Sequence, residues 1–307
     1  MCRMLGMVSV QSGAAEAAPL PSWEHLVRAP HSLRRQSEAG KTLPEDPPGH
    51  ADSWGIGWFD SLGRVSLIRQ TGSAAASAFF ALTAEAAARE QGKARGSGAR
   101  TLIGHLRKAV CGAVTSENAH PVRVDYPVPD HPVMPYESLL VAHNGTVKPP
   151  LLQTLREELA GREEARSDCD TVVLAGWLGA RMEAAPNTPM ETMQAALSEL
   201  QGRAEQVSAG DLSQAYSGLV LLIAFSGGLF ALRQYSRNPQ YYTLYRRRLT
   251  PADTVENSEN AVPVAADGWI IASEPTDNGD WELMEPGVLS YFSVKSTDPI
   301  LVPIAVQ

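Results

Sequence analysis

The chain begins MCRMLGMVSV, residues 1–10, and this stretch decides how the rest is interpreted. Removal of the initiator Met1 would leave Cys2 with a thiol and a free α-amine on one residue. An α-amine is a weak enough base to be partly unprotonated near neutral pH, so it can accept the proton of its own thiol. The apolar run from Leu5 to Val10 predicts a strand that anchors Cys2 in a sheet. Residues 1–10 therefore offer a nucleophile and its base together, although an incidental cysteine beside the initiator has the same pattern.

Composition sets the broad class of the protein. The chain has 307 residues, of which 44% are hydrophobic and 20% charged, a composition typical of a globular protein with a large core. The net charge of -8 argues against a nucleic-acid-binding surface, which needs a basic footprint. No apolar run reaches the length of a membrane span, and no secretory signal is visible. We therefore expect a cytoplasmic protein that binds neither nucleic acid nor membranes.

The cysteines indicate neither disulfides nor zinc. Cys2, Cys111 and Cys169 are an odd number, lie far apart, and include no CxxC pair. His105 and His143 flank strand residues without a third ligand at metal spacing. We expect no metal and no cofactor, and we interpret Cys111 and Cys169 as packing residues.

The order of elements predicts packed sheets with outer helices. Apolar runs predict strands first, helices in the middle of the chain, and strands again, which differs from a regular βαβ alternation. The polar stretch within residues 31–50 is interpreted as a long surface loop that borders the site, and residues 250–262 as another loop. The length allows one domain or two small ones, and we expect a single domain over residues 2–307.

An asparagine and a glycine form a candidate oxyanion site. Asn144 and Gly145 directly follow the predicted strand Leu139 to Ala142. The asparagine NH₂ and the glycine N–H are suitable donors for a tetrahedral oxyanion, and glycine lets the backbone approach a substrate. A hairpin turn is the alternative interpretation, because Asn-Gly is a strong turn signal.

Two charged residues could hold the two ends of an amino acid. Arg107 lies in the apolar stretch Thr101 to Val110, where a guanidinium must be paired. It could bind a substrate carboxylate bidentately or form an internal salt bridge. Asp168 precedes the predicted helix Thr171 to Met182, where it could cap the helix or bind an ammonium group.

His120 precedes a proline, and the sequence leaves two roles open for it. It is either a hydrogen-bonded structural histidine or part of the site.

Together these motifs resemble the class II glutamine amidotransferases, the family of N-terminal-nucleophile glutaminases. Met1-Cys2 matches the processed start of the family, and GHLRKAV (104–110), ENAHP (117–121), HNG (143–145) and SDCD (167–170) follow in the family's order. HADSWGIGWF (50–59) and ASEPTDNGDWELMEPG (272–287) resemble its stand-alone branch. That branch includes the γ-glutamyl amidohydrolases of ergothioneine synthesis.

The resemblance implies an α+β fold, a four-layer αββα sandwich with mostly antiparallel sheets. It implies that Cys2 attacks the γ-amide of glutamine, Asn144 and Gly145 hold the oxyanion, and Arg107 and Asp168 bind the α-carboxylate and α-amino group, with His120 nearby. Three positions depart from the family pattern: Val110 replaces a small hydroxyl residue, Asp170 replaces glutamate, and residues 52–55 read DSWG.

Three functions stay open at this point. The first is hydrolysis of glutamine, with ammonia passing to a separate synthase subunit, since no acceptor-binding domain is evident after the motif around Glu274. The second is hydrolysis of a substituted γ-glutamyl amide, with the leaving-group pocket set by residues 31–50. The third is a non-catalytic regulatory subunit with the same fold.

Overall fold

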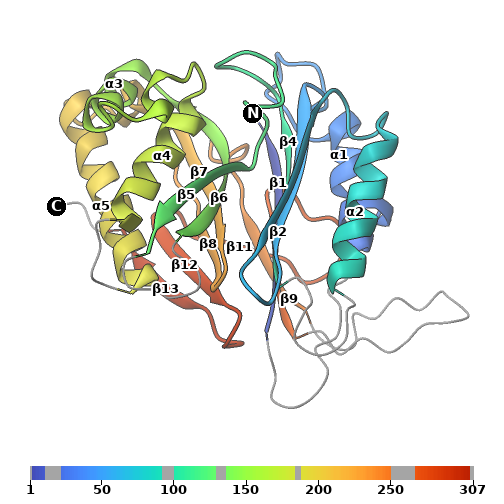
Figure 1. Cartoon of the computed structure of the whole chain (residues 1–307). Helices are drawn as coiled ribbons and strands as arrows, with labels where there is room; N and C mark the ends of the chain where they lie inside the picture. Colours follow the sequence, from blue (N-terminus) through green and yellow to red (C-terminus); the bar gives the residue numbers. More distant parts are fainter. Residues whose placement is uncertain are drawn as a thin grey trace, which may run out of the picture.

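Two antiparallel sheets pack face to face and carry helices on both outer faces (Figure 1). The computed structural model describes residues 2–10, 22–91, 100–128, 136–183, 188–249 and 267–304. The expected α+β fold with four αββα layers is confirmed. No helix within these ranges is both long and apolar enough to cross a membrane.

The first sheet contains the N-terminal strand near its centre. Its strands are β1 (Arg3–Ser9), β2 (Ser53–Phe59), β3 (Val65–Thr71), β4 (Thr101–Arg107), β9 (Tyr245–Leu249), β10 (Gly268–Ala272) and β11 (Glu282–Leu283). Their order across the sheet is β11-β9-β10-β1-β4-β2-β3. Because β10 and β4 both pair with β1, the strand that carries the nucleophile candidate is held on both edges.

The second sheet contains the Asn-Gly motif. Its strands are β5 (Val122–Pro127), β6 (Tyr136–Val147), β7 (Tyr216–Phe225), β8 (Gly228–Leu232), β12 (Val288–Ser293) and β13 (Ile300–Pro303). Their order is β13-β12-β8-β7-β6-β5. The strand predicted for Leu139 to Ala142 is therefore longer than expected, and Asn144 and Gly145 lie inside β6 instead of in a hairpin turn.

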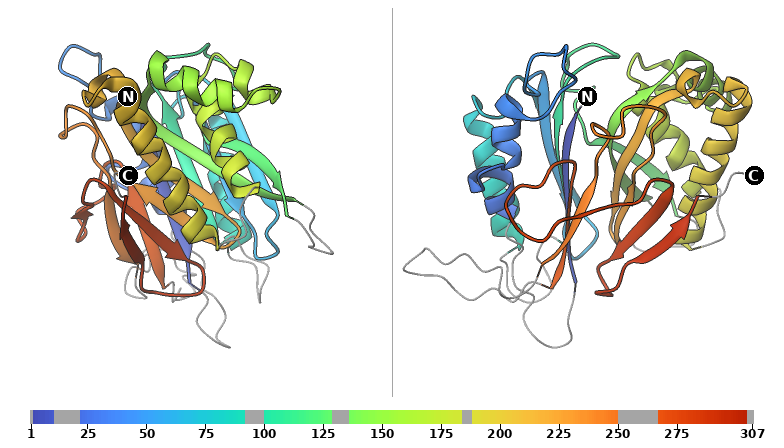
Figure 2. Two further views of the ribbon diagram at one scale, coloured as in Figure 1. Left: turned by 90° about the vertical axis from the view of Figure 1, so that its left-hand side faces the viewer. Right: turned by 180° about the vertical axis from the view of Figure 1, so that it is seen from behind.

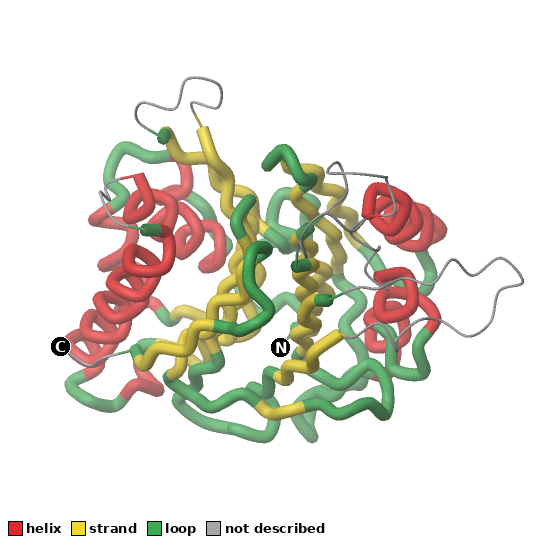
Figure 3. The backbone as a smooth tube through the Cα atoms, turned by 90° about the horizontal axis from the view of Figure 1, so that it is seen from below, coloured by secondary structure: helices red, strands yellow, loops and turns green. Residues whose placement is uncertain are grey.

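Helices cover the two outer faces. The first sheet packs against η1 (Glu24–Arg28), α1 (Leu33–Ala39) and α2 (Ala78–Gln91), and the second against α3 (Pro149–Glu158), α4 (Asp170–Glu183) and α5 (Pro189–Ser208) (Figures 2 and 3). Short 3₁₀ turns lie at η2 (Glu163–Arg166) and η3 (Leu212–Gln214). The predicted loop over residues 31–50 is wrong in part, because α1 lies within it; the loop predicted over residues 250–262 lies outside the described residues.

The alternation of side chains along β1 positions the site. Met4 and Val8 face the core between the sheets, whereas Leu5 and Met7 pack on the helical side. Gly6 allows the sheets to approach, since a Cβ there would lie 2.7 Å from a methyl carbon of Leu229. Successive side chains of a strand point to opposite faces. A residue two positions before Met4 therefore faces the space between the sheets, at one end of the sandwich.

Candidate active site

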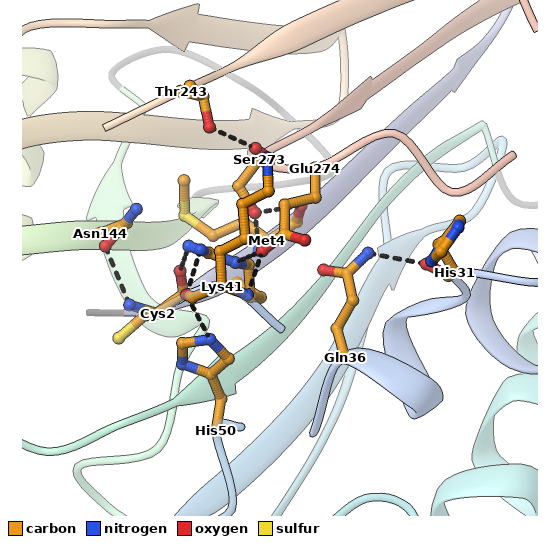
Figure 4. A network of polar contacts seen from close by, with 11 residues as sticks. Cys2, Met4, His31, Gln36, Lys41, His50, Asn144, Thr243, Ser273 and Glu274 are labelled. Atoms are coloured by element: carbon orange, nitrogen blue, oxygen red, sulfur yellow. Dashed lines mark hydrogen bonds and ion pairs between the residues drawn. The ribbon is translucent and has the colours of Figure 1, made fainter. Parts of the chain in front are cut away.

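Cys2 lies just before β1, with its main chain held by the opposite sheet. Its nitrogen donates a hydrogen bond to Asn144 Oδ1 at 2.9 Å (Figure 4). Its Sγ is 3.9 Å from the carbonyl oxygen of Lys108, a distance at which a thiol makes at most a weak hydrogen bond. The side chain of Cys2 is buried. Residues 142 positions apart in the chain thus meet because β1 and β6 face each other.

The two polar side-chain atoms of Asn144 differ in their hydrogen bonding. The side chain is fully buried, and its Oδ1 is occupied by the Cys2 nitrogen. Its Nδ2 has no hydrogen-bond partner among the described residues. A buried amide donor without a partner is unfavourable unless a ligand uses it. Such a donor on the residue that holds Cys2 can donate a hydrogen bond to the negatively charged oxygen of a tetrahedral intermediate.

Gly145 occupies a position that only glycine fits. Its φ is +148°, and a Cβ there would lie 1.9 Å from the carbonyl oxygen of Gly218. The pairing of β6 with β7 shifts register between Gly145 and Val147, as a bulge does. The bulge turns the strand next to the nucleophile, and Thr146 within it lines the same pocket as Cys2.

Arg107 ends β4 and faces the space between the sheets. Its guanidinium is buried and binds main-chain oxygens of the loop that follows β4: Nη1 donates to Ala113 at 2.9 Å, and Nη2 to Cys111 and, at 3.5 Å, to Gly112. These described contacts are with carbonyl groups, not with the carboxylate that the salt-bridge alternative requires. Residues 111–113 thus use the donors that a substrate carboxylate would need.

Asp168 binds the same loop from its other side. Its Oδ2 accepts a hydrogen bond from the Ala113 nitrogen at 2.8 Å, and its Oδ1 accepts one from Asn118 Nδ2 at 2.9 Å. The first of these bonds, followed by the second, lowers the pKa of the exposed Asp168 carboxyl from its ordinary value. These bonds go to residues before α4, so the described contacts do not include the helix cap considered from the sequence.

The helix start is instead fastened by Asp170. Its Oδ1 accepts from the Thr171 nitrogen at 2.9 Å and its Oδ2 from the Val147 nitrogen at 2.8 Å. His143 Nδ1 lies 3.1 Å from Thr171 Oγ1. These bonds join the first turn of α4 to the end of β6, directly behind the Asn-Gly pair.

A small pocket brings most of these residues together. It is lined by Cys2, Arg107, Lys108, Val110, Cys111, His120, His143, Gly145, Thr146, Asp170 and Thr171. Two of the predicted residues do not line the pocket: Asn144 is bonded to the Cys2 nitrogen, and Asp168 to the Ala113 nitrogen. No role was assigned to Asp170 or Lys108 from the sequence. Both lie inside the quoted motifs: Asp170 is two positions after Asp168, and Lys108 directly follows Arg107.

Buried histidines lie at the pocket, where His120 and His143 are lining residues and His105 is in contact with both. His120 Nδ1 lies 3.1 Å from His105 Nε2, which lies 3.3 Å from the carbonyl oxygen of His143. Burial lowers the pKa of His105 to about 3 and that of His120 well below its ordinary value. Both rings are therefore neutral near pH 7. The described residues contain no cluster of three or more histidine, cysteine or acidic side chains able to hold a metal.

Comparison with solved structures supports the fold. The chain is similar to a glutamine phosphoribosylpyrophosphate amidotransferase from B. subtilis, with 14% identity and a TM-score of 0.55, over all of this chain and 50% of that one. It therefore spans about half the length of that protein.

Two smaller proteins match along nearly their whole length. A glutamine aminotransferase class-II domain protein from Silicibacter pomeroyi has 16% identity and a TM-score of 0.52, over 98% of this chain and 99% of that one. A predicted glutamine amidotransferase from Pseudomonas aeruginosa has the same identity and TM-score, over 96% and 98%. A comparison with curated proteins found no match.

The family follows from the sequence model that the chain matches. The model for class-II glutamine amidotransferases matches residues 38–300, most of the chain. The protein belongs to the class-II glutamine amidotransferases.

Proposed function

We propose that this protein hydrolyses the γ-amide of glutamine, or of a γ-glutamyl compound, through a thioester on Cys2. The observation that carries the proposal is the bond between the Cys2 nitrogen and Asn144 Oδ1. Within the described part of the chain it leaves Asn144 Nδ2, on the residue that holds the nucleophile, without a partner. After removal of Met1, the same nitrogen would be the α-amine. The base, the nucleophile and one oxyanion donor would then be fixed together.

The reaction proceeds in two halves. The α-amine takes the thiol proton, Sγ attacks the carboxamide carbon, and the oxyanion is stabilised by Asn144 Nδ2 and the Gly145 nitrogen. The C–N bond breaks, the ammonium of Cys2 returns the proton to the leaving nitrogen, and ammonia or an amine departs. Water then attacks the γ-glutamyl thioester, gives its proton to the same amine, and glutamate leaves with the thiol restored.

Arg107 and Asp168 would bind the head of the substrate. An α-carboxylate makes stronger, charge-assisted hydrogen bonds to a guanidinium than neutral carbonyl groups do. We infer that it displaces one or more of the carbonyl oxygens of residues 111–113 from Arg107. That displacement moves Ala113, which also binds Asp168, so both ends of the amino acid would be recognised through one loop. His120 would act as a neutral wall of the pocket.

Two features of the proposal concern the surroundings of the enzyme. A single domain over residues 2–307 would send ammonia to a separate synthase subunit, or release it if the protein is a plain hydrolase. A reducing compartment such as the cytoplasm would keep the thiol of Cys2 free. No metal or cofactor takes part in the proposed steps.

A substituted γ-glutamyl amide is the second candidate substrate. Val110 is 72% exposed, lines the pocket, and presents an apolar side chain beside Cys2. An apolar wall favours a leaving amine that carries carbon over ammonia alone. Rates of hydrolysis of glutamine and of γ-glutamyl amines, compared by glutamate release, separate the two substrates.

The test is turnover together with intact mass. We expect purified protein to lack the mass of Met1 and to release glutamate from one of these substrates, and Cys2→Ala protein to release none while unfolding at the same temperature. Retained Met1, or turnover by Cys2→Ala, contradicts the mechanism. A processed, folded wild-type protein that hydrolyses none of these amides would support the non-catalytic subunit instead.

A further inference from the structure

Arg3 is a buried cation directly beside the nucleophile. It is the first residue of β1, and its side chain lies on the opposite face of the strand from the space between the sheets, in phase with Leu5 and Met7. The residue is fully buried. A guanidinium out of contact with water is costly unless each of its donors has a partner. Its partners therefore show what the position is used for.

The donors of Arg3 bind three parts of the chain. Nη1 donates to the carbonyl oxygen of Cys2 at 2.8 Å, Nε forms an ion pair with Glu274, and Nη2 donates to the carbonyl oxygen of Lys41. Glu274 Oε1 also accepts a hydrogen bond from the Lys41 nitrogen at 2.7 Å. The guanidinium and its counter-ion thus hold residue 41 by both its N–H and its C=O.

Cys2 is consequently fixed at both ends of its main chain. Asn144 holds the nitrogen from the second sheet, and Arg3 holds the carbonyl from the opposite face of the first sheet. Met4, two residues further along the strand, is fixed too: its nitrogen donates to Ser273 Oγ at 2.9 Å and its carbonyl accepts from the Ser273 nitrogen at 3.0 Å. With the main chain held by these hydrogen bonds, the thiol moves mainly by rotation of the Cys2 side chain.

We propose that Arg3, with Glu274 as its counter-ion, is a positioning residue that holds the Cys2 backbone so that the thiol meets the amide carbon. The inference rests on the proposed function and deepens it. A guanidinium suits this task because its planar fork donates in several fixed directions, whereas an ammonium is a compact point charge. Misplacement of a reacting group by about 1 Å is enough to lower a rate roughly 10²-fold.

The same network ties the nucleophile to residues 41–50. His50 Nε2 lies 3.2 Å from the Lys41 carbonyl oxygen, and Lys108 Nζ donates to the Pro47 carbonyl at 2.7 Å. The carbonyl oxygen of Lys108 also lies 3.9 Å from the Cys2 Sγ. The segment is therefore fastened on both sides of Cys2, so a change at Arg3 alters the position of the nucleophile and of this neighbouring wall together.

Stability alone does not account for a buried ion pair at this place. Replacing both members of such a pair with apolar residues of similar size is often neutral or stabilising. The double variant Arg3→Met with Glu274→Met therefore removes the bond to Cys2 without leaving an unpaired buried charge. It also takes the partners of the Cys2 and Lys41 carbonyls, so thermal unfolding is measured beside kcat. Arg233 provides a matched control, because it is also buried and donates to the carbonyl oxygens of Tyr242 at 2.8 Å and Met284 at 2.9 Å.

The experiment measures kcat, KM and thermal unfolding of wild type, the double variant, Arg3→Lys and Arg233→Lys. We expect the double variant to lose about 10- to 100-fold in kcat at nearly unchanged KM. Arg3→Lys, which keeps the charge, should lose less. Arg233→Lys should unfold at a lower temperature with kcat within about 2-fold of wild type, since truncating a buried arginine leaves carbonyls unsatisfied. Equal kcat values for wild type and folded double variant would overturn the proposal, as would an equal loss for Arg3→Lys and Arg233→Lys.

A second readout separates this inference from the proposed function. Iodoacetamide carries a carboxamide, and its alkylation of Cys2 can be followed by mass without any turnover. We expect slower alkylation in the double variant and in Arg3→Lys, and a wild-type rate in Arg233→Lys. A wild type that hydrolyses no amide contradicts the proposed function, while the alkylation rates still decide the role of Arg3: identical rates in all four proteins would refute it.

Discussion

The two halves of the site differ in how ready they are for a substrate. On the nucleophile side, which comprises Cys2, Asn144 and Gly145, the first two residues are buried and Gly145 is half-buried. Cys2 and Asn144 are bonded to each other, and Asn144 Nδ2 has no partner among the described residues. The clamp side, comprising Arg107, residues 111–113 and Asp168, has its donors and acceptors satisfied by its own loop. The nucleophile side offers a ligand a donor that is not yet hydrogen-bonded. On the clamp side, a ligand must replace hydrogen bonds that already exist.

This difference assigns different tasks to the two halves. A donor that is fixed before the substrate arrives costs nothing to reorganise when charge develops in the transition state. A guanidinium that must exchange carbonyl groups for a carboxylate gains only the difference between neutral and charge-assisted hydrogen bonds. Changes on the nucleophile side should therefore lower kcat or destabilise the fold, whereas changes on the clamp side should raise KM.

The largest effect is expected at Gly145. In Gly145→Ala, the new Cβ would meet the Gly218 carbonyl oxygen at 1.9 Å in a backbone conformation that favours glycine. Steric overlap and backbone strain together should lower the free energy of unfolding by about 3 to 5 kcal/mol and abolish turnover. Gly72→Ala is the control, because φ there is +95° with open space around it, so it should lose only about 1 to 2 kcal/mol. Equal losses in urea unfolding would show that the nucleophile side is not rigid.

Asn144 tests the spare donor itself. Asn144→Asp keeps an oxygen for the Cys2 nitrogen but has no Nδ2, whereas Asn144→Ala removes both. Each should lower kcat about 10²–10³-fold through the lost oxyanion donor, with KM changed little. If Asn144→Asp retained the wild-type kcat, the spare donor would have no part in the reaction, and the contrast between the two halves would lose its chemical meaning.

Arg107 tests the clamp side. Arg107→Lys keeps the charge but loses the fork, so KM for glutamine should rise roughly 10- to 100-fold while kcat falls much less. With 4-aminobutanamide, which lacks the α-carboxylate, wild type and variant should differ by less than about 3-fold in kcat/KM. The same loss with both substrates would mean that Arg107 only supports the loop through its bonds to Cys111 and Ala113.

Strand alternation explains why the proximity of Cys2 and Asn144 could be predicted. Two apolar runs, one beginning at Leu5 and the other ending at Ala142, each predict a strand. In a sandwich, one face of each strand is buried against the opposite sheet. That places residues near the ends of these strands in one layer, and the structure has Cys2 bonded to Asn144. The turn alternative for Asn144 and Gly145 fails because pairing of β6 with β7 outweighs a local signal.

The clamp side depends on contacts that no local pattern contains. Arg107 donates to main-chain carbonyl groups because the loop after β4 folds back onto it. Every residue has such a carbonyl, so residue types do not indicate these partners. Asp168 was considered as a cap for the helix predicted from Thr171, but its described bonds go to Ala113 and Asn118. Asp170, the first residue of α4, accepts from the Thr171 nitrogen instead. The ion pair of Arg3 with Glu274 joins residues 271 positions apart, so periodicity could not reveal it. The helix α1 was missed because its seven residues lie in a polar stretch.

The smallest effect is expected at Asp168, and its sign with pH is specific. Asn in place of Asp168 can accept from either Ala113 or Asn118 but not from both, so KM should rise only about 2- to 5-fold at this exposed position. The lowered pKa of Asp168 means that its folded carboxyl binds fewer protons than the unfolded one, so its stabilisation is present above the ordinary carboxyl value and is lost as pH falls through the folded value. Asp168→Asn should therefore unfold at lower urea than wild type near pH ~7, with the difference shrinking as the pH falls below the ordinary carboxyl pKa. Asp211→Asn, another exposed carboxyl whose pKa is lowered by its bonds to Ser213 and Gln214, should show the same convergence with no change in KM. A rise in KM shared by both variants would remove Asp168 from the clamp side and leave Arg107 as the charged residue proposed to bind the substrate there.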